Sequence, residues 1–247
     1  MLRLSALLLL LGGCAGSAPA EAPRVLVFTK TDGWRHDSIP AAVEAVRQLG
    51  AAGGFGVDHT EDAGAFTDDR LAGYAAVVFL LTSEDVLEPA QEAAVERFVR
   101  AGGGYAGVHS AADTEYDWPF YGDLVGAYFE GHPPGTPAAV VRVVDRGHPS
   151  TAHLPAEWSR TDEWYNYRAA PEGVRVLATL DEATYEGGTM GDDHPIAWCH
   201  EALGGRSWYT GGGHTIESYA DDAFRAHLLG GLRWAAGLAD GDCPPTP

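Results

Sequence analysis

The residues of this sequence best suited to chemistry lie at the ends of apolar segments, and the clearest example is residues 102–114, GGGYAGVHSAADT. Gly103–Val108 is apolar enough to form a buried strand, and His109 follows it directly. Gly107 stands two positions before this histidine and Ala111 two positions after it. A strand that turns sharply to present one side chain to a pocket needs small residues on both sides. The pattern therefore predicts such a turn with His109 at its tip.

The side chain at this turn decides which chemistry is available. In α/β hydrolases and class I glutamine amidotransferases the same position holds a nucleophilic serine or cysteine. Imidazole cannot form a thioester, so His109 excludes the simplest glutaminase chemistry and predicts acid–base work or metal binding. Two alternatives stay open: His109 is a buried structural histidine, or its neighbour Ser110 is the nucleophile. If His109 projects into a solvent-lined pocket, replacing it with alanine should change stability by no more than about 1 kcal/mol.

Further polar clusters follow other apolar segments. The loop after the first predicted strand carries a lysine, an indole, an arginine and an imidazole, in Lys30, Trp34, Arg35 and His36. Later segments contribute His132, Glu163, Tyr165, Asn166 and His214. Aromatic faces stack on the apolar side of a pyranose, and carboxylates and amides bind its hydroxyls, so this mixture suggests a sugar site. For Tyr165 ordinary core packing is the alternative.

Three of the histidines are candidate metal ligands. His36, His109 and His132 fall on separate loops and lack a short ligand spacing such as H-E-x-x-H. If they converge, they would bind a divalent metal such as zinc. No other cofactor is predicted.

The elements that must position these residues alternate between strands and helices. Strands are predicted at Arg24–Thr29, Gly56–His59, Tyr74–Leu81 and Gly103–Val108, with helices at 38–49 and 89–100 between them. Apolar strands alternating with helices predict a doubly wound, mainly parallel α/β sheet, with ligands bound beyond the carboxyl ends of the strands.

The second half of the sequence follows a different pattern. Helical aromatics at 118–129 precede strand-like segments, and a helix is predicted at 219–236. The strand-like segments are 138–144, 158–167, 175–180, 195–199 and 206–210, which we interpret as strands added to the sheet.

Composition narrows the class of partner. The formal net charge is -19 and Lys30 is the single lysine, which argues against nucleic acid or an acidic membrane surface as a partner. About 225 residues follow the N-terminal segment, enough for one well-buried domain.

The N-terminus predicts export. A basic start and the leucine-rich run 4–11 are typical of a signal peptide, and the run closes on Leu-Gly-Gly-Cys14, a lipobox-like end. We expect a signal peptide at 1–13, lipidation of Cys14, a tether at 14–23, one domain at 24–237 and a tail at 238–247. The protein would then be lipid-anchored to the bacterial cell envelope, on its periplasmic or extracellular face. Ordinary cleavage near residue 18 or 20 is the alternative. In an oxidising compartment Cys199 and Cys243 could form a disulfide.

Several ordered motifs together resemble the ThuA-like family, named for trehalose utilisation. They are KTDGWRHDSI, GGGYAGVHSAADT, YGDLVGAYFEGHP, DEWYNY, HPIAWCHE and YTGGGHT, and they extend over 24–234. The resemblance implies a class I glutamine amidotransferase-like (flavodoxin-like) fold. It also implies a role in carbohydrate catabolism, on disaccharides that a partner dehydrogenase has oxidised to 3-keto sugars, such as oxidised trehalose or sucrose.

Cleavage of such a substrate by hydrolysis or elimination needs a base, an acid and a stabiliser of the enolate. From their positions we assign His109 as base, Glu163 or Asp113 as the acid or as a residue that orients the base, and Lys30 or a metal as stabiliser. Substrate binding falls to the loop residues and aromatics, namely Trp34, Arg35, His36, Ser110, Tyr165, Asn166 and His214. Two other classes of protein fit the same residues: a non-catalytic, lipid-anchored sugar-binding protein and a metal-dependent hydrolase.

Overall fold

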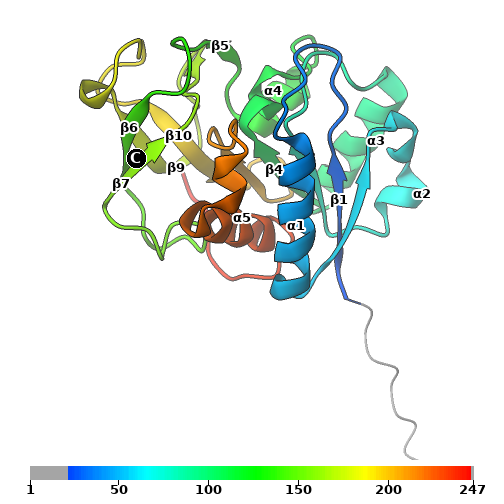
Figure 1. Cartoon of the computed structure of the whole chain (residues 1–247). Helices are drawn as coiled ribbons and strands as arrows, with labels where there is room; N and C mark the ends of the chain where they lie inside the picture. The colour runs from blue at the N-terminus through cyan, green and yellow to red at the C-terminus, as the bar shows by residue number, and fades with distance from the viewer. Residues whose placement is uncertain (1–21, 246–247) are drawn as a thin grey trace, which may run out of the picture.

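The computed structural model describes residues 22–245, and nine of its strands form one sheet in the order β2-β1-β3-β4-β11-β10-β9-β6-β7. The half that begins at β2 is parallel. It contains β2 (Gly56–Thr60), β1 (Arg24–Phe28), β3 (Ala76–Leu80), β4 (Gly104–Val108) and β11 (Ser207–Thr210). In Figure 1 β1 points upward, so the loops that follow the parallel strands lie along the upper edge of the molecule.

Four antiparallel strands extend this nucleus. They are β10 (Pro195–His200), β9 (Arg175–Asp181), β6 (Ala138–Val143) and β7 (Glu157–Thr161). The predicted α/β sheet with added strands is therefore confirmed, and the added strands continue the sheet beyond β11.

Helices cover both faces of the sheet, as the buried strands β3 and β4 require. They are α1 (Ile39–Gly53), α2 (Asp68–Leu71), α3 (Pro89–Arg100), α4 (Pro119–Val125) and α5 (Asp222–Ala235). A Cβ at Gly104 would meet the Ala235 carbonyl of α5, whereas the next residue, Tyr105, bonds Tyr121 of α4. Since successive strand residues point to opposite faces, α5 and α4 lie on opposite sides. The helix α1 packs beside α5 (Figure 1).

Two sequence-based assignments of elements were too long. The aromatic stretch 118–129 is not one helix, because α4 ends at Val125, Gly126 caps it with φ 91°, and the strand β5 (Phe129–Gly131) follows. The stretch 158–167 divides into β7 and β8 (Asn166–Tyr167), and β8 pairs with β5 in a separate two-stranded sheet. Between β7 and β8 the chain leaves the large sheet, and this excursion carries Glu163 and Tyr165.

Short 3₁₀ segments complete the chain at η1 (Ala63–Ala65), η2 (His109–Asp113), η3 (Glu182–Thr184) and η4 (Glu217–Ala220). Near the C-terminus a disulfide joins Cys199 of β10 to Cys243. No helix among residues 22–245 combines the length and apolar character needed to cross a membrane. Cys14 and the N-terminal segment 1–21 lie outside the described residues.

Candidate functional site

The turn after β4 has the geometry that the sequence predicts. His109 has a φ of 53°, in the left-handed region, and begins the 3₁₀ segment η2. A Cβ at Gly107 would lie 2.8 Å from the Tyr105 hydroxyl and 3.2 Å from the Ala111 Cβ. Only glycine fits at that position, so the small residues around His109 are required by packing.

The imidazole of His109 is fully buried, unlike the solvent-lined side chain that we expected from the sequence. Its Nδ1 lies 2.8 Å from the carbonyl oxygen of Gly211 at the end of β11. A carbonyl can only accept a hydrogen bond, so Nδ1 carries the proton and Nε2 keeps its lone pair. That Nε2 lies 3.3 Å from Glu163 Oε2 and 3.2 Å from His214 Nδ1.

Four side chains from different parts of the chain converge at this point. His36 comes from the loop after β1, His109 from the turn after β4, Glu163 from the excursion after β7, and His214 from the turn after β11. One potential ligand atom of each lies within 4.8 Å of those of the other three. We call these four residues the His–Glu cluster. Three imidazoles and a carboxylate are a donor set for a divalent transition metal.

Burial and charge act together in this cluster. Burial alone would raise the pKa of the Glu163 carboxyl, but its contacts with the imidazoles of His109 and His214 hold it well below its usual value. The pKa of His214 is raised, because its interaction with Glu163 outweighs burial. Burial, followed by the charges of His109 and His214, lowers the pKa of His36 to about 3. The cluster therefore contains an ionised carboxylate and a neutral His36 at neutral pH.

A cavity of about 390 Å³ opens beside the cluster. Its lining combines the cluster residues that reach the surface with aromatic and acidic side chains: Trp34, His36, Asp113, Phe129, His132, Glu163, Tyr165 and His214. The indole of Trp34 is 70 % exposed. The ring of Tyr165 covers His109, with 4.2 Å between ring centroids. Larger hollows beside Arg97 and beside Arg175 contain no histidine among their described lining residues.

Two titratable side chains lie in this cavity outside the cluster. His132 Nδ1 lies 2.8 Å from the Pro133 carbonyl oxygen and 3.3 Å from Glu163 Oε1. Both neighbours accept hydrogen bonds, so Nδ1 carries the proton and Nε2 is basic. Burial raises the pKa of Asp113, although a hydrogen bond from the Tyr116 hydroxyl opposes this effect.

Other residues predicted from the sequence do not line this cavity. The Lys30 ammonium donates to the Val86 carbonyl at 2.8 Å, and Arg35 forms an exposed ion pair with Glu61. Asn166 bonds the backbone of residues 187 and 189, which fixes that loop. Ser110 is buried, and its Oγ lies 3.5 Å from His36 Nδ1, so it contacts His36 without lining the cavity.

Sequence reasoning missed two features of the site. Phe129 contributes to the cavity wall, with its ring centroid 4.2 Å from that of Tyr165. Asp162 lies directly before Glu163 and bonds the turn that carries His214. The adjacent acidic pair Asp162-Glu163 after a strand-like segment was the available signal, but only the fold shows that Asp162 points away from the cavity.

The fold defines a class I glutamine amidotransferase-like α/β protein, and His109 occupies the turn after its strand β4. A glutamine amidotransferase from Thermotoga maritima, 10% identical, covers 87% of this chain and 98% of its own with a TM-score of 0.53, which shows the fold alone.

The chain belongs to the ThuA family, described as trehalose utilisation, whose sequence model matches residues 24–235. A ThuA-like protein from Bacteroides uniformis is 24% identical, with 91% of this chain and 95% of that one covered and a TM-score of 0.74. One from Parabacteroides merdae is 20% identical, with 91% and 97% covered and a TM-score of 0.71. No curated protein matches the sequence.

Proposed function

We propose that this protein cleaves the glycosidic bond of 3-keto disaccharides, such as oxidised trehalose or sucrose, in the cavity beside the His–Glu cluster. The observation that supports this most strongly is the composition of the cavity. Aromatic faces of Trp34, Phe129 and Tyr165 share it with a basic imidazole and a carboxyl group of raised pKa. Aromatic faces suit the sugar ring, and the titratable pair suits proton transfer.

The reaction proceeds by elimination. A ketone at C3 acidifies the proton on C2, which passes to a base while negative charge moves to the C3 oxygen. The electron pair then forms the C1=C2 double bond, the C1–O bond breaks, and the leaving oxygen takes a proton from an acid. The products are a 2-hydroxy-3-keto-glucal and the second sugar. Addition of water across C1=C2 then yields the free 3-keto sugar.

The geometry favours different roles for the histidines than the sequence suggested. His109 has no exposed surface, so a base in contact with the substrate is better supplied by His132, whose Nε2 is basic. Asp113 is the acid, because its raised pKa retains a proton at higher pH. The His–Glu cluster stabilises the charge on the C3 oxygen, the role for which Lys30 was the other candidate.

The experiment compares 3-keto-trehalose and 3-keto-sucrose with their unoxidised parents on one preparation of purified protein. We expect turnover of the oxidised sugars only, and transient absorbance from the conjugated enone. Equal turnover of the parents would overturn the elimination scheme, because an unoxidised sugar has no acidic C2 proton. Binding of 3-keto sugars without turnover would instead identify a sugar-binding protein.

We also propose that the protein is exported and lipid-anchored, and that a sugar 3-dehydrogenase supplies its substrate. The leucine-rich run before Cys14 supports export, and the Cys199–Cys243 disulfide is consistent with an oxidising compartment. Cys14→Ser should move the protein from the membrane fraction to the soluble one. A wild-type protein already soluble after export would rule out the anchor.

A further inference from the structure

We propose that the His–Glu cluster is a divalent metal site, with His36, His109, Glu163 and His214 as ligands and one side open to the cavity. Binding of the metal requires only these side chains and is independent of the proposed reaction. Its use as the stabiliser of the C3 oxygen rests on the proposed function.

The spacing of the ligand atoms fits a metal ion. His109 Nε2, His214 Nδ1 and Glu163 Oε2 form a nearly equilateral triangle with sides of 3.2, 3.2 and 3.3 Å. Ligands about 2.0–2.1 Å from zinc in a tetrahedral arrangement are about 3.3–3.4 Å apart. An ion near this triangle would therefore be at bonding distance from all three atoms, with His36 available as the fourth ligand.

Hydrogen bonds already hold His109 in the form that a metal needs. Its Nδ1 proton is directed to the Gly211 carbonyl, so the lone pair on Nε2 points into the triangle. A second bond of this kind fixes the tautomer and orientation of metal-bound histidines in general. The same contact joins the end of β11 to the turn after β4, so the ligand is held by two central strands.

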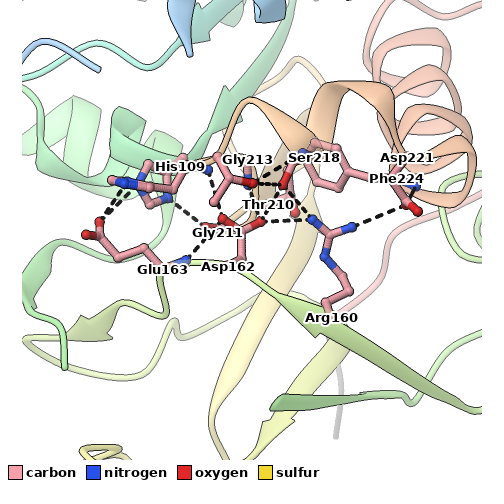
Figure 2. A network of polar contacts seen from close by, with 12 residues as sticks. His109, Arg160, Asp162, Glu163, Thr210, Gly211, Gly213, Ser218, Asp221 and Phe224 are labelled. Carbon is pink, nitrogen blue, oxygen red and sulfur yellow. Dashed lines mark hydrogen bonds and ion pairs between the residues drawn. The ribbon is translucent and has the colours of Figure 1, made fainter. Parts of the chain in front are cut away.

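A buried carboxylate positions the other two ligands of the triangle. Asp162 Oδ1 accepts hydrogen bonds from the backbone N–H of Glu163 at 3.1 Å and of His214 at 3.0 Å. Its Oδ2 accepts from Gly213 N, Arg160 Nη2 and Ser218 Oγ, each at 2.9 Å. Figure 2 shows Asp162 between Arg160 and the turn at Gly211–Gly213. Asp162 is therefore a positioning residue that fixes Glu163 relative to His214.

The donor set and its surroundings indicate the class of ion. Imidazole nitrogens select first-row transition metals, and carboxylate and nitrogen donors at this spacing suit Zn²⁺. Three of the four ligands also line the cavity, so a substrate oxygen can reach the metal as an additional ligand. A bound ion would then act as a Lewis acid and stabilise the charge on the C3 oxygen without transfer of a proton to that oxygen.

The test measures binding of zinc alone to protein stripped with a chelator, by titration calorimetry and elemental analysis, without any sugar. Wild type should bind one zinc ion per chain. Glu163→Gln and His214→Ala should each weaken binding by more than about 100-fold, and Asp162→Asn by about 10–100-fold. His132→Gln is the matched control, and its zinc affinity should stay within about threefold of wild type.

Folding is checked for each variant by circular dichroism, so a lost site is distinguished from a lost fold. No zinc bound by folded wild type, or unchanged affinity in both Glu163→Gln and His214→Ala, would overturn the proposal. Loss of zinc in His132→Gln would replace this ligand set with one that includes His132. Zinc binding without turnover of 3-keto sugars would leave the metal site standing and refute the proposed reaction. Turnover by zinc-free protein would leave the reaction standing and refute the role of the metal as its stabiliser.

Discussion

At the scale of single residues, the site contains two kinds of histidine, which differ in burial. His109 is buried behind the cavity wall, bonded to Gly211 through one nitrogen and facing Glu163 with the other. His132 lies in the wall itself, with its side chain 36% exposed. The buried histidine is suited to holding an ion, and the exposed one to exchanging a proton with a substrate.

His132→Ala should lower kcat on a 3-keto disaccharide by about 10²–10⁴-fold, the usual effect of removing a general base. Because the side chain is partly exposed, the melting temperature should change little. His153→Ala, which removes an exposed histidine bonded to the Ala223 carbonyl, is the control and should keep wild-type kcat. An active His132→Ala variant would remove this residue from the mechanism.

His109→Ala should abolish zinc binding and also destabilise the protein. Loss of a buried side chain and of the hydrogen bond to Gly211 should lower the free energy of unfolding by about 1–3 kcal/mol. This is more than the sequence alone suggested, because the imidazole is buried. Urea denaturation and zinc titration on one preparation check both effects, and a variant that binds zinc normally would contradict the ligand role.

At the scale of elements, the parallel strands and the helices that cover them determine where the ligands meet. The strand β4 packs against α5, with Gly104 against the Ala235 carbonyl, and it ends at Val108, directly before His109. The strand β11 lies next to β4 and leads into the turn that carries His214. A change in the contact between β4 and α5 should therefore affect the whole fold.

Gly104→Ala should destabilise the protein by about 1–3 kcal/mol, because the added methyl group has no space against the helix backbone. Gly131→Ala is the matched control. A Cβ there meets no atom within 4 Å, so stability should stay within about 1 kcal/mol of wild type. Thermal unfolding of the two variants measures the difference, and equal melting temperatures would show that β4 and α5 can move apart at little cost.

At the scale of the whole molecule, the disulfide connects the C-terminal tail to β10, the antiparallel strand that lies next to β11 in the sheet. Cys243 is 44 residues from Cys199 in sequence, and β11, α5 and the tail lie between them. Loop-closure entropy predicts that Cys243→Ser lowers the free energy of unfolding by about 4 kcal/mol. Guanidinium denaturation of wild type with and without reductant measures the same effect. If reduction leaves the free energy of unfolding unchanged, the disulfide does not stabilise the protein.

Buried neutral histidines should make stability depend on pH. Burial lowers the pKa of His227 to about 3, while its nitrogens bond the Ser150 carbonyl and the Thr210 hydroxyl. Between pH 6.5, its ordinary pKa, and pH 3, the unfolded chain binds a proton at this residue that the folded protein does not. The histidine's contribution to stability is therefore lost as pH falls through this window.

The effect is measured as the difference in unfolding free energy between wild type and His227→Gln. That difference should shift against wild type by about 2 kcal/mol from pH 6.5 to pH 5, at about 1.4 kcal/mol per pH unit. Comparing two proteins removes the changes due to other titrating groups. A difference that does not vary with pH would mean that His227 has the same pKa in the folded and unfolded states, and would contradict the effect of burial.

The sequence by itself determined the features that depend on neighbours along the chain. Alternating apolar strands and helices predicted the doubly wound sheet, because burial on both faces requires continuous apolar runs. The turn at His109 was predictable because steric limits at Gly107 and Ala111 are local. The mixture of carboxylate, aromatic and amide side chains around Glu163 and Tyr165 was visible for the same reason.

Only the tertiary structure decided which residues form the cluster. His36, His109 and Glu163 were candidates, but the sequence placed His132 with the metal ligands and His214 with the substrate. Their roles depend on the excursion between β7 and β8 and on the hydrogen bonds of Asp162, which join segments about 50 residues apart. Lys30 stood out as the single lysine, yet its ammonium donates to the backbone carbonyl of Val86, outside the cavity. Contacts of this range follow from how the whole chain packs, because no local spacing encodes them.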